Sequence, residues 1–304
     1  MRIAEFGLRN EERSNSNSRR SQISGQHPPH ASNHQITKPP NPQSAIPNPQ
    51  STSMSTEKNL AIVIRVVDFS ESSCVVTLFT RDFGKISALA KGARRPKSSF
   101  EAALDLLAVC RVVFLRKSSD ALDLLTEAKL ERRFRSATRD LSRLYAGYYV
   151  AELLRDLTDN GDPHPDLFQA ADDTLAHLDE DGDVTAEVLR FELTALRVLG
   201  HLPSLDACVG CGEALEATGR TAFGLLSGGV LCTRCRVGKR QVVSVSAGAI
   251  HAMQQFAESE GESWRTLEID RRLRGELRGL LNNYLKHLLG HRPKMHDYLG
   301  TLAK

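Results

Sequence analysis

Four cysteines offer the most specific chemistry in this chain. They form two Cys-x-x-Cys pairs, Cys208 with Cys211 and Cys232 with Cys235, separated by twenty residues. Each pair directs two thiolates toward one ion from a single tight turn, and this spacing is typical of a tetrahedral zinc site. The pattern predicts structural Zn²⁺. A thiol knuckle without metal and a redox or Fe–S centre are the alternatives.

The cysteine pattern does not favour catalysis. Four thiolates would fill a tetrahedral shell and leave no position for water. The sequence has no His-x-Glu motif, which would supply the acid–base partner of a zinc deaminase. The remaining cysteines, Cys74 and Cys110, lie within apolar strand patterns and are expected in the core.

A second pattern is a group of cations ahead of the cysteines. The net charge is only +3, so the distribution of charge matters more than its total. Cations at short intervals, beside a glycine and a proline, suit contact with a phosphate backbone and carry no sequence specificity. A solvated charge run is the alternative. The predicted DNA-binding residues are Arg81, Lys85, Lys91, Arg94, Arg95 and Lys97.

The residues that position these cations have the pattern of a small β-barrel. Strands are expected at 60–67, 74–80, 85–90, 109–115 and 121–130, with a hairpin at 81–84 and a short helix at 100–107. Five strands grouped three and two suit an OB-fold, and an SH3-like barrel fits the pattern nearly as well. Base stacking on single strands would fall to an aromatic such as Phe69, Phe83 or Phe100.

From residue 137 the apolar period becomes helical. Stripes over 141–152, 167–178 and 184–199 predict three helices, and two more are expected at 247–256 and 269–289. Four arginines are expected on the polar side of the last helix, as a solvated face or a second anion-binding patch. They are Arg271, Arg272, Arg274 and Arg278.

The chain therefore divides into an α+β arrangement of three parts. Residues 1–58 hold seven of the twelve prolines and almost no apolar pattern, so we expect disorder there. An OB-fold DNA-binding domain is expected at 59–135, and a helical domain at 136–304 with a zinc knuckle inserted at about 205–240. No apolar run is long enough to cross a bilayer, which makes a cytoplasmic location the expectation.

Several of these motifs, read together, resemble the RecO family of bacterial recombinational repair proteins. The resemblance extends over about residues 58–290, and the lysine–glycine–alanine–arginine loop combined with the late cysteine knuckle is quite specific to that family. The segments that carry it are Arg65–Glu71, Ala90–Ser98, Leu199–Pro203, Cys208–Cys211 and Leu231–Cys235.

The resemblance implies a function without covalent chemistry. Such proteins bind single- and double-stranded DNA, anneal complementary strands, associate with RecR and with the acidic C-terminal tail of single-stranded DNA-binding protein, and help to load RecA. A non-enzymatic, nucleoid-associated mediator of recombinational repair is thus expected. One alternative is a zinc-ribbon transcription or translation factor. Another is a metalloenzyme acting on nucleic acid, which would require an open metal site.

Overall fold

The structure is a computed structural model, and it describes residues 55–100, 103–117, 121–180, 182–258 and 263–301. The described residues belong to one compact unit. Disorder is expected for residues 1–58, and residues 1–54 of that segment lie outside the described residues. For residues 55–58 the expectation is wrong, because they begin the first strand by pairing with Arg116–Val113 on a strand far along the chain.

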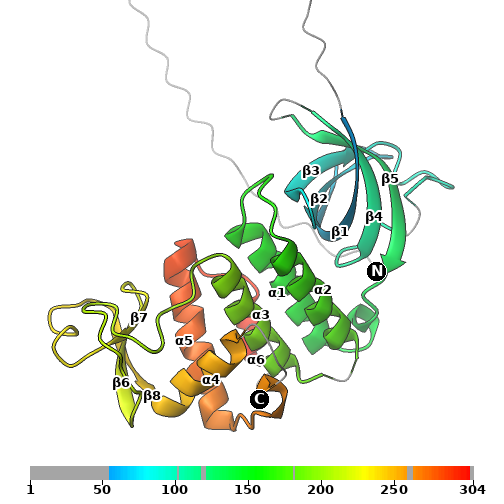
Figure 1. Cartoon of the computed structure of the whole chain (residues 1–304). Helices are drawn as coiled ribbons and strands as arrows, with labels where there is room; N and C mark the ends of the chain where they lie inside the picture. Colours follow the sequence, from blue (N-terminus) through cyan, green and yellow to red (C-terminus); the bar gives the residue numbers. More distant parts are fainter. Residues whose placement is uncertain (1–54, 101–102, 118–120, 181, 259–262, 302–304) are drawn as a thin grey trace, which may run out of the picture. The chain divides into compact units, whose positions relative to one another are not determined.

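Five strands close into a barrel in the order β1-β2-β3-β5-β4 (Figure 1). One end of β1 pairs antiparallel with β4 and the other end pairs antiparallel with β2, while β3 and β5 close the barrel in parallel. The predicted five-stranded, OB-like barrel followed by a helical domain is confirmed. The strands are β1 (Ser55–Asp68), β2 (Cys74–Thr80), β3 (Gly84–Ala90), β4 (Val109–Arg116) and β5 (Asp123–Arg132).

Alternating apolar residues fill the barrel. Every second residue of β3 is buried, which places Ile86, Ala88 and Ala90 in the barrel core. Cys74 and Cys110 are buried in the same cluster, as their apolar surroundings predict. Burial raises the pKa of the Cys110 thiol to about 12, so this side chain stays a neutral core group.

The β2–β3 hairpin packs against the helical part of the chain. Gly84 has φ +66°, and a Cβ there would lie 2.0 Å from the carbonyl oxygen of Asp162. The amide of Gly161 donates to the carbonyl of Lys85 at 2.9 Å. Gly84 is therefore required both by the turn and by the close approach of the 160–162 segment.

The described residues of the connection between β3 and β4 do not form the helix expected at 100–107. Its described residues form turns, and Phe100 is buried. The Leu107 amide donates to the Val63 carbonyl at 2.8 Å, and the Val63 amide donates to the Ala108 carbonyl at 2.9 Å. This pairing with an irregular point of β1 outweighs local helix propensity, which is a weak prior.

Helices make up most of the second part of the chain. Aspartates initiate three of them: the side chains of Asp140, Asp183 and Asp270 accept hydrogen bonds from first-turn amides. The buried faces share one apolar core. The helices are α1 (Leu141–Leu157), α2 (Pro165–Asp179), α3 (Val184–Val198), α4 (Ala247–Ala257), α5 (Arg271–Leu289) and α6 (His296–Thr301).

A buried polar network links four of these helices. Arg278 of α5 forms an ion pair with Glu192 of α3, whose carboxylate also accepts a 2.5 Å hydrogen bond from the Tyr149 hydroxyl of α1. The imidazole Nε2 of His296, on α6, lies 2.9 Å from the same hydroxyl. The expectation that Arg278 lies on a polar face is wrong, because its partner carboxylate is in the core.

A small sheet was not anticipated from the sequence. Strands β6 (Arg220–Gly224), β7 (Gly229–Leu231) and β8 (Val242–Ser246) pair antiparallel in the order β7-β6-β8. The strands are short and lie between turns, so the alternation of apolar and polar residues along them is too brief to indicate strands. Among the described residues, none of the helices has the length and apolar character that a membrane span requires.

Candidate metal centre and nucleic-acid interface

The small sheet brings the two cysteine pairs together. Cys208 and Cys211 precede β6, whereas Cys232 and Cys235 directly follow β7. The Val209 amide donates to the Val230 carbonyl at 3.0 Å, which ties the first turn to β7. As a result the four Sγ atoms all lie within 4.8 Å of one another.

Backbone amides favour the thiolate form of two of these sulfurs, those of Cys208 and Cys232, by lowering the pKa of each thiol. Cys208 Sγ accepts from the amides of Cys232 at 3.3 Å and Gly210 at 3.4 Å, and Cys232 Sγ accepts from the Cys235 amide at 3.4 Å. The Cys232 amide has the largest effect and, with the Gly210 amide, lowers the pKa of the Cys208 thiol to about 6. The thiolate is the form that binds metal.

The distance between two of the sulfurs matches that expected around a tetrahedral ion. Zinc–sulfur bonds of about 2.3 Å place ligand sulfurs about 3.8 Å apart in a tetrahedron. The Sγ atoms of Cys211 and Cys232 are 3.9 Å apart. The predicted four-cysteine set is therefore assembled, and it could hold a metal ion with no ligand position left over.

Two glycines are needed for this assembly. A Cβ on Gly210 would lie 2.8 Å from the Cβ and 3.0 Å from the Sγ of Cys235. Gly229 has φ +153°, and a Cβ there would lie 2.4 Å from the carbonyl oxygen of Ser204. Both positions exclude a side chain, because Cys235 occupies the space beside Gly210 and the Ser204 backbone occupies the space beside Gly229.

The cationic loop after β3 is exposed and locally ordered. We call residues 91–97 the barrel loop. Its backbone amides donate hydrogen bonds within the loop and to the turn between β1 and β2. The Arg95 amide donates to the Gly92 carbonyl at 3.0 Å, and the Arg94 amide donates to the Ser72 carbonyl at 3.1 Å. The Arg94 guanidinium pairs with Asp68 at 2.5 Å. Among the described residues, the side chains of Lys91, Arg95 and Lys97 have no carboxylate partner.

The other two predicted cations lie at the opposite end of β3. Arg81 is exposed at the β2–β3 hairpin and pairs with its neighbour Asp82 at 3.2 Å. The Lys85 ammonium donates to the carbonyls of Arg155 and Thr158 at the end of α1. Burial lowers the pKa of this ammonium. Lys85 thus holds the hairpin to α1, and the structure does not bring it together with the barrel loop.

The aromatic candidates are also separated by the structure. Phe83 packs edge-on against Phe114 with ring centroids 5.6 Å apart, and the Arg116 guanidinium lies over the Phe83 ring, 5.7 Å from its centroid. Phe100 is buried in the barrel core. Phe69 is 65% exposed, in the turn next to the barrel loop, and is the candidate that remains open to a base.

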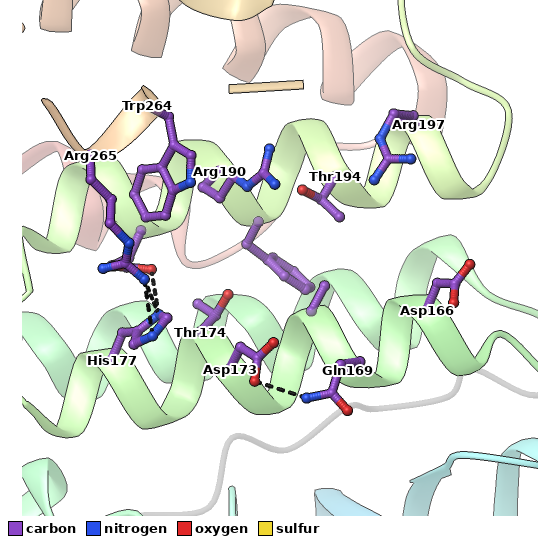
Figure 2. A pocket seen from close by; sticks show the side chains of 13 residues that line it. Asp166, Gln169, Asp173, Thr174, His177, Arg190, Thr194, Arg197, Trp264 and Arg265 are labelled. Atoms are coloured by element: carbon purple, nitrogen blue, oxygen red, sulfur yellow. Dashed lines mark hydrogen bonds and ion pairs between the residues drawn. The ribbon is translucent and has the colours of Figure 1, made fainter. Parts of the chain in front are cut away.

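A cavity of about 680 Å³ lies between α2, α3 and the short helix η2 (Ser263–Thr266). Figure 2 shows Arg190, Thr194 and Arg197 along the α3 wall and acidic and amide side chains along the α2 wall. Three arginines and three carboxylates line it in total. Because these charges offset one another, the cavity offers no net charge to an anionic ligand.

Comparison with known families agrees with this architecture. The model described as Recombination protein O N terminal matches residues 54–134, which include the barrel. The model described as Recombination protein O C terminal matches residues 138–297, which include the helices and the cysteine cluster. The chain belongs to the RecO family. The predicted family resemblance is thereby confirmed.

Individual relatives extend over most of the chain. It is similar to the DNA repair protein RecO of Rhodopirellula baltica, with 43% identity over 263 residues, 79% of this chain and 97% of the relative. It is also similar to the DNA repair protein RecO of Myxococcus xanthus, with 36% identity over 245 residues, 80% of this chain and 96% of the relative. The chain accordingly has a role in DNA repair and recombination.

Proposed function

We propose that this RecO-family chain is a non-enzymatic mediator that binds DNA and anneals complementary strands on gapped DNA during recombinational repair. The observation that carries the proposal is the barrel loop. It presents four cations within seven residues, and a carboxylate engages one of them. Its hydrogen-bonded turns hold the loop backbone in place before DNA arrives, so less loop entropy is lost on binding.

Annealing follows from charge neutralisation. Two strands repel each other through their phosphates, and cations that bind phosphates release counterions and reduce that repulsion. The contacts go to the backbone, so they leave base edges free to pair. Arg81 adds a cation at the hairpin end of β3. Lys85 takes no part in this proposal, because backbone carbonyls hold its ammonium.

The partners proposed for this function are those of recombinational repair. They are single- and double-stranded DNA, RecR, the acidic C-terminal tail of single-stranded DNA-binding protein and, indirectly, RecA. The barrel at 59–135 would bind DNA and the helical domain would carry partner surfaces. A nucleoid-associated, cytoplasmic location goes with this set of partners.

Salt dependence of binding tests the barrel loop. Changing Arg94 and Arg95 together to Ala should reduce the log–log salt slope for single-stranded DNA by about 1.4, because each lost phosphate contact is worth about 0.7. The matched control changes Arg111 and Lys129, which are exposed on β4 and β5, to Ala. An equal loss of slope in the control would show that net charge alone matters and would contradict the proposal.

Annealing of complementary oligonucleotides tests the function itself. The wild-type chain should accelerate annealing without nucleotide, both on bare strands and on strands coated with single-stranded DNA-binding protein. The Arg94–Arg95 variant should lose most of this acceleration. A wild-type chain that binds DNA but does not accelerate annealing would favour a zinc-ribbon transcription or translation factor.

For the cysteine cluster we propose Zn²⁺ with a structural role. Metal analysis should find one zinc per chain, held by Cys208, Cys211, Cys232 and Cys235. Replacing Cys232 with Ser should release the metal and lower the melting temperature, since metal-binding free energy contributes directly to folding. A chain purified without zinc, or a variant with unchanged melting, would refute this assignment.

A further inference from the structure

The segment that follows the metal-ligand pair of Cys232 and Cys235 carries an unexplained excess of cations. Between Glu216 and Glu258 the sequence contains no Asp or Glu, although it contains five Arg or Lys residues. A structural metal site accounts for the cysteines of this stretch but not for its cations. Four of the five cations fall within seven residues, and they are Arg234, Arg236, Lys239 and Arg240.

The structure places these cations in the connection from β7 to β8, residues 232–241, which we call the knuckle loop. Every side chain from 236 to 241 is exposed, and Val237 is 77% exposed. Arg234 is engaged by Glu213, with hydrogen bonds of 2.7 and 2.8 Å. Within the part of the chain that the structure describes, Arg236, Lys239 and Arg240 have no carboxylate partner.

The knuckle loop is held by its own backbone. The Arg236 amide donates to the Cys232 carbonyl at 3.1 Å, and the Lys239 amide donates to the Arg236 carbonyl at 3.3 Å. Gly238 has φ +75°, and no atom lies within 4 Å of a Cβ built there. The loop therefore presents its cations on an ordered turn whose glycine leaves room for close approach of another backbone.

These features together favour a polyanion with regularly spaced charges. A phosphodiester backbone offers such charges and requires no pocket. The exposed Val237 would lie against sugar or base once the flanking cations bind phosphates. Charge compensation inside the metal centre is the competing explanation, since four thiolates and one divalent ion sum to −2. That explanation predicts an effect on metal retention.

We infer that the knuckle loop is a second nucleic-acid contact of this chain, with Arg236, Lys239 and Arg240 binding backbone phosphates. The inference rests on the proposed DNA-binding function and extends it to a module separate from the barrel. Two cationic sites on different modules allow one molecule to hold a strand at two places, or to hold two strands during annealing.

The test uses the full zinc-loaded chain with Lys239 and Arg240 both changed to Gln. For single-stranded DNA the log–log salt slope should fall by about 1.4, similarly for unrelated sequences. Zinc content and melting temperature should match those of the wild type. The control removes two exposed cations elsewhere in the helical part, Arg139→Gln with Lys286→Gln, and should retain the wild-type slope.

Each of the remaining outcomes contradicts either the inference or the proposed function. An unchanged slope in the Lys239–Arg240 variant, with the barrel-loop variant still impaired, removes the inference and leaves the proposed function standing. Loss of zinc from the variant assigns these cations to the metal centre instead. Unchanged DNA binding with weakened binding of a synthetic acidic peptide assigns the loop to a protein partner. A wild-type chain without salt-dependent DNA binding removes the proposed function as well.

Discussion

Acidification should destabilise this protein through one buried imidazole, that of His296. The side chain is 2% exposed and its Nε2 lies 2.9 Å from the Tyr149 hydroxyl. That hydroxyl donates its proton to Glu192, so the imidazole must donate to the hydroxyl oxygen from Nε2. Nδ1 is then the unprotonated nitrogen, and no described group forms a hydrogen bond with it.

Protonation of this nitrogen is costly in the folded state. Burial first, and then the charges of Arg278 and Arg292, lower the pKa of His296 from 6.5 to about 4. Between these two values the unfolded chain binds more protons than the folded chain, so stability rises with pH. The contribution of the neutral imidazole to the stability of the fold is complete above pH 6.5 and is lost as the pH falls toward 4. At about 1.36 kcal/mol per pKa unit, the full loss is about 3 kcal/mol.

Urea unfolding across the range from about pH 4.5 to about pH 7.5 measures this loss. The variant His296→Gln retains an N–H donor for Tyr149 but does not titrate. At the lower pH, its acid-induced loss of unfolding free energy should be smaller than that of the wild type by about 2.5 kcal/mol. His251→Gln, at an exposed position, is the control and should follow the wild type. Parallel pH curves for wild type and His296→Gln would refute the reasoning.

Three further perturbations follow from single contacts. Gly210→Ala should weaken zinc retention in a chelator competition, because its Cβ would displace Cys235; unchanged retention would show that the turn can shift. Gly275 lies in an exposed turn of α5, and no atom lies within 4 Å of a Cβ built there. Gly275→Ala should therefore raise the free energy of unfolding by about 0.5–1 kcal/mol, and a lower melting temperature would show that the new methyl group clashes. Arg278→Met should cost about 3–5 kcal/mol by leaving the buried Glu192 carboxylate without its ion-pair partner, and adding Glu192→Gln should restore part of this loss. Additive effects of these two changes in unfolding experiments would mean that the pair is not coupled.

The features predicted correctly from sequence are those that depend on neighbours in the chain. The two Cys-x-x-Cys turns are local, so their capacity to hold a metal ion together can be predicted before the fold is known. The strands of the barrel and the helix stripes follow from the spacing of apolar residues, as the alternating burial of β3 shows. Family membership follows from the same motifs, because they are stretches of contiguous residues.

Tertiary structure alone decided which cations are free. Lys85 and Lys91 lie at the two ends of one strand, and nothing in their immediate sequence separates their roles. The chain turns back to place the carbonyls of Arg155 and Thr158 beside Lys85, while the barrel loop stays exposed. Arg278 differs from its exposed helix neighbour Arg271 for the same kind of reason, since a carboxylate from α3 meets it in the core. A cation's charge is a property of its residue type, but its partner comes from a distant part of the chain, and only folding brings the two together.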